Sequence, residues 1–222
     1  MILNIDLVSD FVCPWCFLGK FRLDRAIEEL RAARPDLDIR VNWLPFFLNP
    51  DTPEAGEPYR AFLEAKFGGP IKADAVLDKV RDAAAEDGLN YAFERIRTRP
   101  NTLQAHRLMY RAQSIGQTPA HIQMLADALF TAHFQEGRDI GDKDTLADIA
   151  AACGERRDAV REWLDGREDI DKVRRMAEGV RSQGIEGVPF FILNRKLAVS
   201  GAQSAAVLGA AILQSLENGK PS

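Results

Sequence analysis

Two cysteines near the start of the chain have the spacing of a redox-active pair. Cys13 and Cys16 stand in the run Cys-Pro-Trp-Cys, so two residues separate the thiols. Thiols at this spacing can close a disulfide when a turn leads into a helix, and the N-terminus of that helix stabilises a thiolate on the first cysteine. We therefore expect Cys13 to be the accessible nucleophile and Cys16, one turn into the helix, to be the partly buried resolving thiol.

Zinc binding is the main alternative use of such a pair. A structural zinc site needs four ligands, and the other candidate ligands are isolated in the sequence: Cys153, His106, His121 and His133. The sequence therefore predicts no metal site. Cys153 follows two alanines, and we expect it to pack as a small hydrophobic residue.

A proline far along the chain is a candidate partner for the cysteines. Val188-Pro189 opens a short apolar run that is typical of a strand. A cis X-Pro bond at a strand start exposes the preceding N–H and C=O and can hold an extended substrate beside a nucleophilic sulfur. A trans proline is also permitted there, but the surrounding order of elements favours the cis form, facing Cys13.

The elements around these residues form two blocks of α/β character. A buried strand is expected at 2–8, a helix from the cysteines to Arg34, and an alternating strand at 37–43. After Gly187 we expect a hairpin with arms at 188–193 and 197–200, and then a helix that begins near Ser204. Between 53 and 183 the patterns are helical and no strand is expected; the predicted helices are 59–67, 73–87, 102–114, 119–134, 143–152, 155–165 and 170–183.

Composition narrows the class of protein. The chain has 222 residues, 46% of them hydrophobic, which is enough for a sizeable core. Its net charge of −4 gives no support to nucleic-acid binding. The opening residues do not have the pattern of a secretory signal, and no stretch approaches the roughly 18 apolar residues of a membrane span. We expect a cytoplasmic protein with no membrane partner, as a monomer or homodimer.

Five segments, taken together and in order, resemble the DsbA-like thioredoxin superfamily and, more narrowly, its FrnE-like thiol-disulfide oxidoreductases. The resemblance covers residues 2 to about 217 and implies a thioredoxin fold with a large all-helical insertion domain. It divides the chain into a discontinuous thioredoxin-like domain, 1–52 and 184–222, and a helical insertion, 53–183. It also implies that Cys13 and Cys16 are the redox pair and that Pro189 is the cis-proline facing them. The segments are Asp10–Cys16, Trp43–Pro50, Asn101–Arg107, Gly187–Phe191 and Ser200–Gln203.

Relatives in the same superfamily lack the dithiol. The 2-hydroxychromene-2-carboxylate isomerases and kappa-class glutathione transferases carry serine at the position of Cys13 and use glutathione. Because both cysteines are present here, the resemblance favours an oxidoreductase that acts on protein or small-molecule disulfides and dithiols. We expect no bound cofactor, with glutathione as a candidate redox partner. A glutathione-dependent isomerase or transferase for a small aromatic compound and a chaperone-like binder are the alternative hypotheses.

Several further side chains are candidates for supporting roles. Pro14, Trp15, Val188 and His106 are candidate substrate contacts, with Trp15 expected at the surface; for His106 a structural role is slightly favoured over a catalytic one. Asp10 could shuttle a proton to Cys16, or could be an ordinary loop carboxylate. A run of arginines could bind an acidic substrate or glutathione carboxylates, but a solvated face is the favoured interpretation; its members are Arg95, Arg97, Arg99, Arg107 and Arg111.

Overall fold

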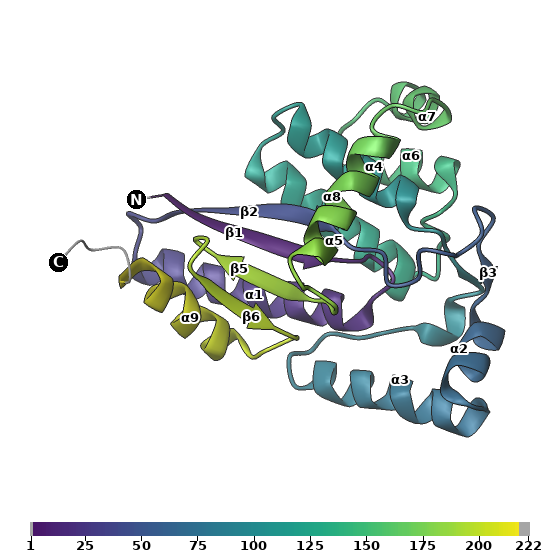
Figure 1. Ribbon diagram of the computed structural model, residues 1–222, viewed down its shortest axis with the longest axis horizontal. Helices are drawn as coiled ribbons and strands as arrows, with labels where there is room; N and C mark the ends of the chain where they lie inside the picture. Colours follow the sequence, from purple (N-terminus) through teal and green to yellow (C-terminus); the bar gives the residue numbers. More distant parts are fainter. Residues whose placement is uncertain (1, 218–222) are drawn as a thin grey trace. The chain divides into compact units, whose positions relative to one another are not determined.

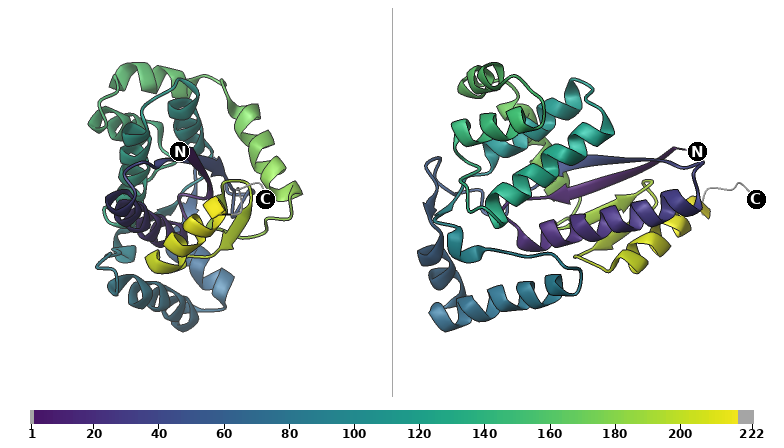
Figure 2. Two further views of the ribbon diagram at one scale, coloured as in Figure 1. Left: turned by 90° about the vertical axis from the view of Figure 1, so that its left-hand side faces the viewer. Right: turned by 180° about the vertical axis from the view of Figure 1, so that it is seen from behind.

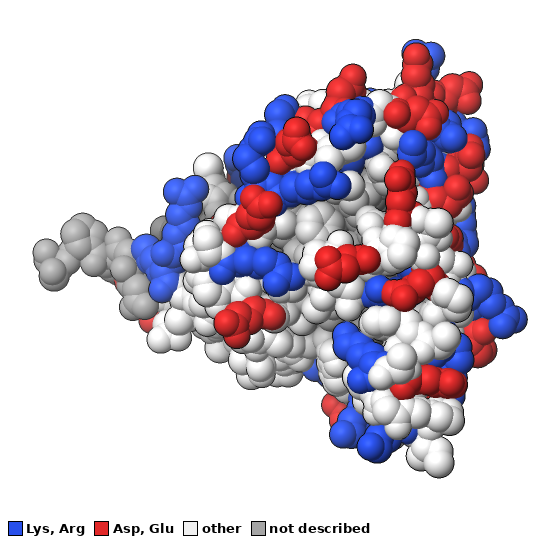
Figure 3. Space-filling model, turned by 45° about the vertical axis from the view of Figure 1, so that its right-hand side comes forward, with Lys and Arg blue, Asp and Glu red and all other residues white. Residues whose placement is uncertain are grey.

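The computed structural model describes residues 2–217 and divides the chain into two compact units. One unit combines Met1–Phe46 with Met176–Ser222, and the other is Phe47–Arg175. Within the described residues no helix has the length and apolar character needed to cross a membrane. Acidic and basic side chains are interspersed over the face drawn in Figure 3.

A four-stranded mixed sheet is the centre of the first unit (Figure 1). Strand β1 lies between a parallel neighbour, β2, and an antiparallel neighbour, β5, which pairs in turn with the edge strand β6. Leu3, Ile5 and Leu7 of β1 are completely buried on one face of the sheet, whereas Asn4 on the other face is exposed. The strands are β1 (Ile2–Ser9), β2 (Asp38–Pro45), β5 (Phe190–Leu193) and β6 (Leu197–Ser200).

Helices cover both faces of this sheet. Helices α1 (Pro14–Ala33) and α9 (Ala205–Glu217) lie side by side on one face, and residues 176–182 of α8 (Ile170–Ser182) lie on the other (Figures 1 and 2). The Arg22 side chain of α1 donates a hydrogen bond to the Ala202 carbonyl just before α9, at 2.8 Å. This hydrogen bond joins α1 to the segment that precedes α9.

The second unit is mainly helical. Its core is apolar and includes Leu108, Leu125, Leu129, Phe130 and Leu146, all completely buried. Its elements are β3 (Glu57–Pro58), α2 (Tyr59–Phe67), α3 (Pro70–Ala85), the short 3₁₀ helix η1 (Phe93–Arg95), β4 (Thr98–Arg99), α4 (Leu103–Ser114), α5 (Pro119–Phe134), α6 (Lys143–Ala152), α7 (Arg157–Asp165) and the first residues of α8.

The expectation that no strand lies between 53 and 183 was wrong. β3 and β4 form a two-residue antiparallel ladder in which Glu57 faces Arg99 and Pro58 faces Thr98. The Arg99 guanidinium also forms an ion pair with the Glu57 carboxylate. Two residues are too few to produce an alternating pattern, so a sequence window cannot detect a ladder of this kind.

Candidate functional site

The Cys-Pro-Trp-Cys run forms the first turn of α1. The Cys13 N–H donates to the Asp10 carbonyl at 3.0 Å, and this turn brings the chain from β1 into the helix. Cys13 is the N-cap residue in extended conformation, and Pro14 occupies the first helical turn, where its missing N–H costs nothing. The Cys13 carbonyl accepts from Cys16 N at 3.0 Å, so the second cysteine lies one turn along the helix.

The Val188–Pro189 segment lies directly against this turn. The peptide bond between the two residues is cis, and the Cys13 thiol donates to the Val188 carbonyl with a sulfur-to-oxygen distance of 3.7 Å. Residues that are far apart in the sequence therefore meet at one sulfur atom.

Gly19 permits this close approach. A Cβ atom at Gly19 would lie 2.8 Å from Pro189 Cγ and 3.3 Å from both Pro189 Cβ and Phe191 Cζ. The first of these distances is shorter than a real carbon–carbon contact. Sequence reasoning missed Gly19, although an isolated glycine inside a helical pattern is a known signal of close packing.

The two thiols differ in their surroundings. Cys16 is completely buried, and burial, followed by its hydrogen bond with Cys13 and the charge of that neighbour, raises the pKa of the Cys16 thiol well above its usual value. Cys16 therefore keeps its proton to a higher pH than an exposed thiol does, which suits a thiol that acts second in an exchange.

The expectation that Cys13 is accessible was wrong for this dithiol form. Only 4% of Cys13 is exposed, because the Val188 carbonyl caps its sulfur and the thiol is packed at the junction of helix and strand. Both cysteines are free thiols in this structure. In this structure the sulfur of Cys13 is therefore shielded from solvent.

The other candidates near the dithiol differ in exposure. Trp15 lies on the surface, 36% exposed, as predicted, and Pro14 is partly exposed. Asp10 is 1% exposed, and its carbonyl closes the turn to Cys13. It is therefore a buried carboxyl group beside the dithiol turn and not a surface loop residue.

His106 and the basic run belong to the second unit. His106 is 5% exposed, and its ring meets the edge of Phe47 at a centroid distance of 5.2 Å. A solvated face was the wrong interpretation for two of the arginines. Arg99 is 6% exposed in its pair with Glu57, and Arg107 is completely buried.

Arg107 is buried because it caps a neighbouring helix. Its guanidinium donates to the carbonyls of Leu164, Gly166 and Glu168 at 2.9 to 3.3 Å, which satisfies acceptors at the C-terminal end of α7. It also lies over the Trp163 ring at 4.5 Å. Sequence reasoning missed this role because carbonyl partners leave no pattern of side chains.

Within the part of the chain that the structure describes, no group of three or more His, Cys, Asp or Glu residues could hold a metal ion. The site in the first unit has two thiols one helical turn apart, the first of which contacts the Val188 carbonyl just before β5. Such an arrangement can exchange a disulfide with a second molecule.

Comparisons with known proteins agree on the family. A sequence profile of the DSBA-like thioredoxin domain matches residues 4–213. The chain is 26% identical over 194 residues to YwbO, an uncharacterized protein of Bacillus subtilis (strain 168), in a match that covers 87% of this chain and 88% of YwbO. It also resembles the solved structure of a probable DsbA oxidoreductase from Streptomyces coelicolor, with a TM-score of 0.85 and 30% identity over 99% of this chain and 92% of that one. A 2-hydroxychromene-2-carboxylate isomerase shares the fold at a TM-score of 0.69, with 16% identity over 98% of this chain and 97% of the other.

Proposed function

The chain belongs to the DSBA-like thioredoxin domain family, and we propose that it is a thiol-disulfide oxidoreductase that acts through Cys13 and Cys16. The observation that carries the proposal is the contact at the Cys13 sulfur. This sulfur lies at the N-cap of α1 and 3.7 Å from the Val188 carbonyl, while Cys16 is buried one turn further along. These are the positions that attack and resolution need.

The first half of the reaction forms a mixed disulfide. The Cys13 thiolate attacks one sulfur of a substrate disulfide, a new bond forms between Cys13 and that sulfur, and the other substrate sulfur leaves as a thiolate that takes up a proton. Loss of the Cys13 proton also removes its hydrogen bond to Val188. The Val188 carbonyl is then free to accept from the backbone of an extended substrate.

The second half releases the substrate. Cys16 loses its proton and attacks the Cys13 sulfur, and the bond to the substrate breaks with the electron pair on the departing sulfur. Two electrons have then moved from the dithiol to the substrate, and the protein holds a Cys13–Cys16 disulfide. Once Cys13 is in a mixed disulfide it no longer carries a charge, so one cause of the raised pKa of Cys16 disappears at the step where its thiolate is needed.

Substitution of each cysteine by serine tests the proposal. With insulin as the substrate and dithiothreitol as the electron donor, we expect Cys13→Ser to lower disulfide reduction by roughly 100-fold or more, because the nucleophile is gone. Cys16→Ser keeps the nucleophile, so incubation with glutathione disulfide is expected to leave a stable mixed disulfide at Cys13, seen by mass spectrometry. Cys153→Ser is the matched control, since Cys153 is a buried thiol in the other unit, and its activity is expected to stay unchanged.

Two results contradict the proposal. One is full insulin reduction by Cys13→Ser. The other is the absence of a trapped adduct in Cys16→Ser together with a glutathione-conjugating activity that survives this change, which favours the transferase hypothesis.

The substrate, the direction of exchange and the cellular location stay predictions of the sequence. We propose protein or small-molecule disulfides as substrates and glutathione as the thiol partner, in the cytoplasm. The equilibrium between dithiol and disulfide in glutathione buffers measures the direction, because 30 mV corresponds to about 1.4 kcal/mol for a two-electron couple. A potential more negative than that of the cytosolic glutathione pool supports a reductant.

A further inference from the structure

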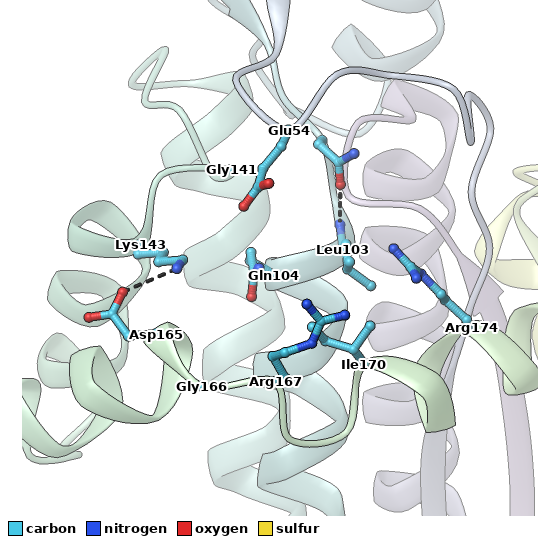
Figure 4. A pocket seen from close by; sticks show the side chains of 11 residues that line it. Glu54, Leu103, Gln104, Gly141, Lys143, Asp165, Gly166, Arg167, Ile170 and Arg174 are labelled. Carbon is cyan, nitrogen blue, oxygen red and sulfur yellow. Dashed lines mark hydrogen bonds and ion pairs between the residues drawn. The ribbon is translucent and has the colours of Figure 1, made fainter.

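The second unit contains a polar cavity that the dithiol chemistry does not use. It has a volume of about 320 Å³ and is lined only by residues of that unit (Figure 4). This is the size of a site for a small molecule. The first residues of α4, α6 and α8 meet in its wall, with Leu103 and Gln104 from α4, Lys143 from α6 and Ile170 from α8.

Gln104 presents a buried donor to this cavity. The residue is only 9% exposed, and its side-chain oxygen accepts a hydrogen bond from Arg107. That contact assigns the amide nitrogen, Nε2, to the other side of the group, where it donates to no residue among 2–217. Because Gln104 lines the cavity, a ligand oxygen there can accept from this nitrogen, while Arg107 holds the amide in place.

The charges around Gln104 favour an anion. Arg167 and Arg174 both line the cavity, and neither forms an ion pair with any described residue. Lys143 is already paired with Asp165 at 3.1 Å. Helix N-termini carry a partial positive charge, so the starts of α4, α6 and α8 add to the potential of the two free guanidinium groups.

Carboxylates limit where an anion can lie. Glu54 lines the same cavity, and in Figure 4 its carboxylate and the guanidinium groups of Arg167 and Arg174 lie toward opposite ends. A second hollow adjoins the Glu54 end and is lined by Asp139 and Asp142, but also by Lys143 and Arg161. Repulsion from Glu54 favours the part of the cavity near Arg167 and Arg174, and Gln104 lies between Glu54 and Arg167 in Figure 4.

The buried Arg107 side chain holds the loop that carries Arg167 in place. The buried Arg107 donates to the carbonyls of the residues on either side of it, Gly166 at 3.0 Å and Glu168 at 2.9 Å. The same guanidinium contacts Gln104. One buried side chain thus fixes both the amide and the loop, as a preorganised binding site requires.

We propose that this cavity binds a small organic molecule through an oxyanion group, a carboxylate or a phosphate. The oxyanion accepts hydrogen bonds from Gln104 Nε2 and pairs with Arg167 and Arg174. The site is built from the second unit alone and does not depend on the thiol chemistry proposed for Cys13 and Cys16.

Binding measured on the full chain tests this proposal without an activity assay. Isothermal titration at low ionic strength uses two probes, succinate and inorganic phosphate, and we expect saturable binding at one site per chain for at least one of them. Succinate alone identifies a carboxylate ligand, and tighter binding of phosphate identifies a phosphorylated one. Gln104→Glu keeps the acceptor for Arg107 but removes the amide donor, and is expected to weaken binding at least tenfold, as is Arg174→Gln.

Arg175→Gln is the matched control. Arg175 is the next residue on α8, is exposed and does not line the cavity, so its loss changes the net charge by the same amount as loss of Arg174 and is expected to leave the affinity unchanged. The proposal is overturned if neither probe binds saturably, or if Gln104→Glu and Arg174→Gln bind as the unchanged protein does. Circular dichroism of each variant checks that the helices are intact.

Discussion

At the scale of single residues, the surroundings of Cys16 make stability depend on pH. Burial, together with the neighbouring Cys13, raises the pKa of the Cys16 thiol above its usual value of 9.0. Such a thiol holds its proton to a higher pH in the folded chain than in the unfolded chain. Its contribution to stability is therefore fully present below pH 9 and is lost as the pH rises through the folded pKa.

We expect the free energy of unfolding to fall from about pH 9 upward, with a slope from this thiol of up to about 1.4 kcal/mol per pH unit. Urea unfolding of Cys13→Ala between pH 8 and 10, compared with the Cys13→Ala/Cys16→Ala double variant, isolates the effect. Neither protein can form the disulfide, and both keep Cys153. The double variant is expected to show a flatter dependence, and identical slopes would contradict the assignment.

The sequence predicts the residues of the dithiol and a buried Cys16, but not the burial of Cys13. The sequence alone identifies a pair of cysteines separated by Pro14 and Trp15 at a helix start, and it also identifies Val188-Pro189. It does not identify the capping of Cys13, because this depends on a carbonyl 175 residues away along the chain. Gln104 and Arg107 were missed as a contacting pair for a similar reason: a buried amide is recognised only once its neighbours are known.

At the scale of elements, the packing of α1 against the start of β5 depends on Gly19. Alanine usually stabilises a helix by about 1 kcal/mol relative to glycine. Here the added carbon would lie 2.8 Å from Pro189 Cγ, and overpacking of this kind costs typically 1 to 3 kcal/mol. The clash therefore exceeds the gain in helix propensity.

We expect Gly19→Ala to lower the free energy of unfolding by about 1 kcal/mol and also to slow the reduction of insulin, since Pro189 is displaced from the dithiol. Gly179→Ala is the matched control: this glycine lies in α8 with no atom within 4 Å of the added carbon, so the same change is expected to stabilise. Equal shifts for the two variants in urea unfolding would show that the contact with Pro189 does not decide the sign.

Helix boundaries were predictable where local chemistry sets them. Helix α5 starts at Pro119 because Thr118 is a side-chain cap that accepts from His121 N at 3.2 Å. Helix α2 ends before Gly68, which has a φ of 80° and adopts the left-handed conformation. The ladder of β3 and β4 has no comparable local cause, because its pairing joins residue 57 to residue 99.

At the scale of the whole molecule, the two units differ in how far apart their contacting residues lie in the sequence. The second unit is one continuous stretch, Phe47–Arg175, in which successive helices such as α5 and α6 contact each other. The first unit must pair Ile5 of β1 with Leu193 of β5, and the whole second unit lies between them in the chain. The sequence shows the same interruption as a gap between its two blocks of strand signals.

This difference predicts the order of folding. Local helical contacts form faster than pairings between distant residues. The distant pairing contributes stability only after a long loop has closed, and closing it costs conformational entropy. In pulsed hydrogen exchange during refolding from urea, we expect amides of α5 and α6 to gain protection at least about ten times faster than amides of β5. The unmodified reduced protein suffices, with peptides resolved by mass spectrometry. Because β6 also pairs with β5 through a short turn, the deciding amides are those of β5 that face β1. Protection of these amides at the same rate as α6, or before it, would contradict the expected order.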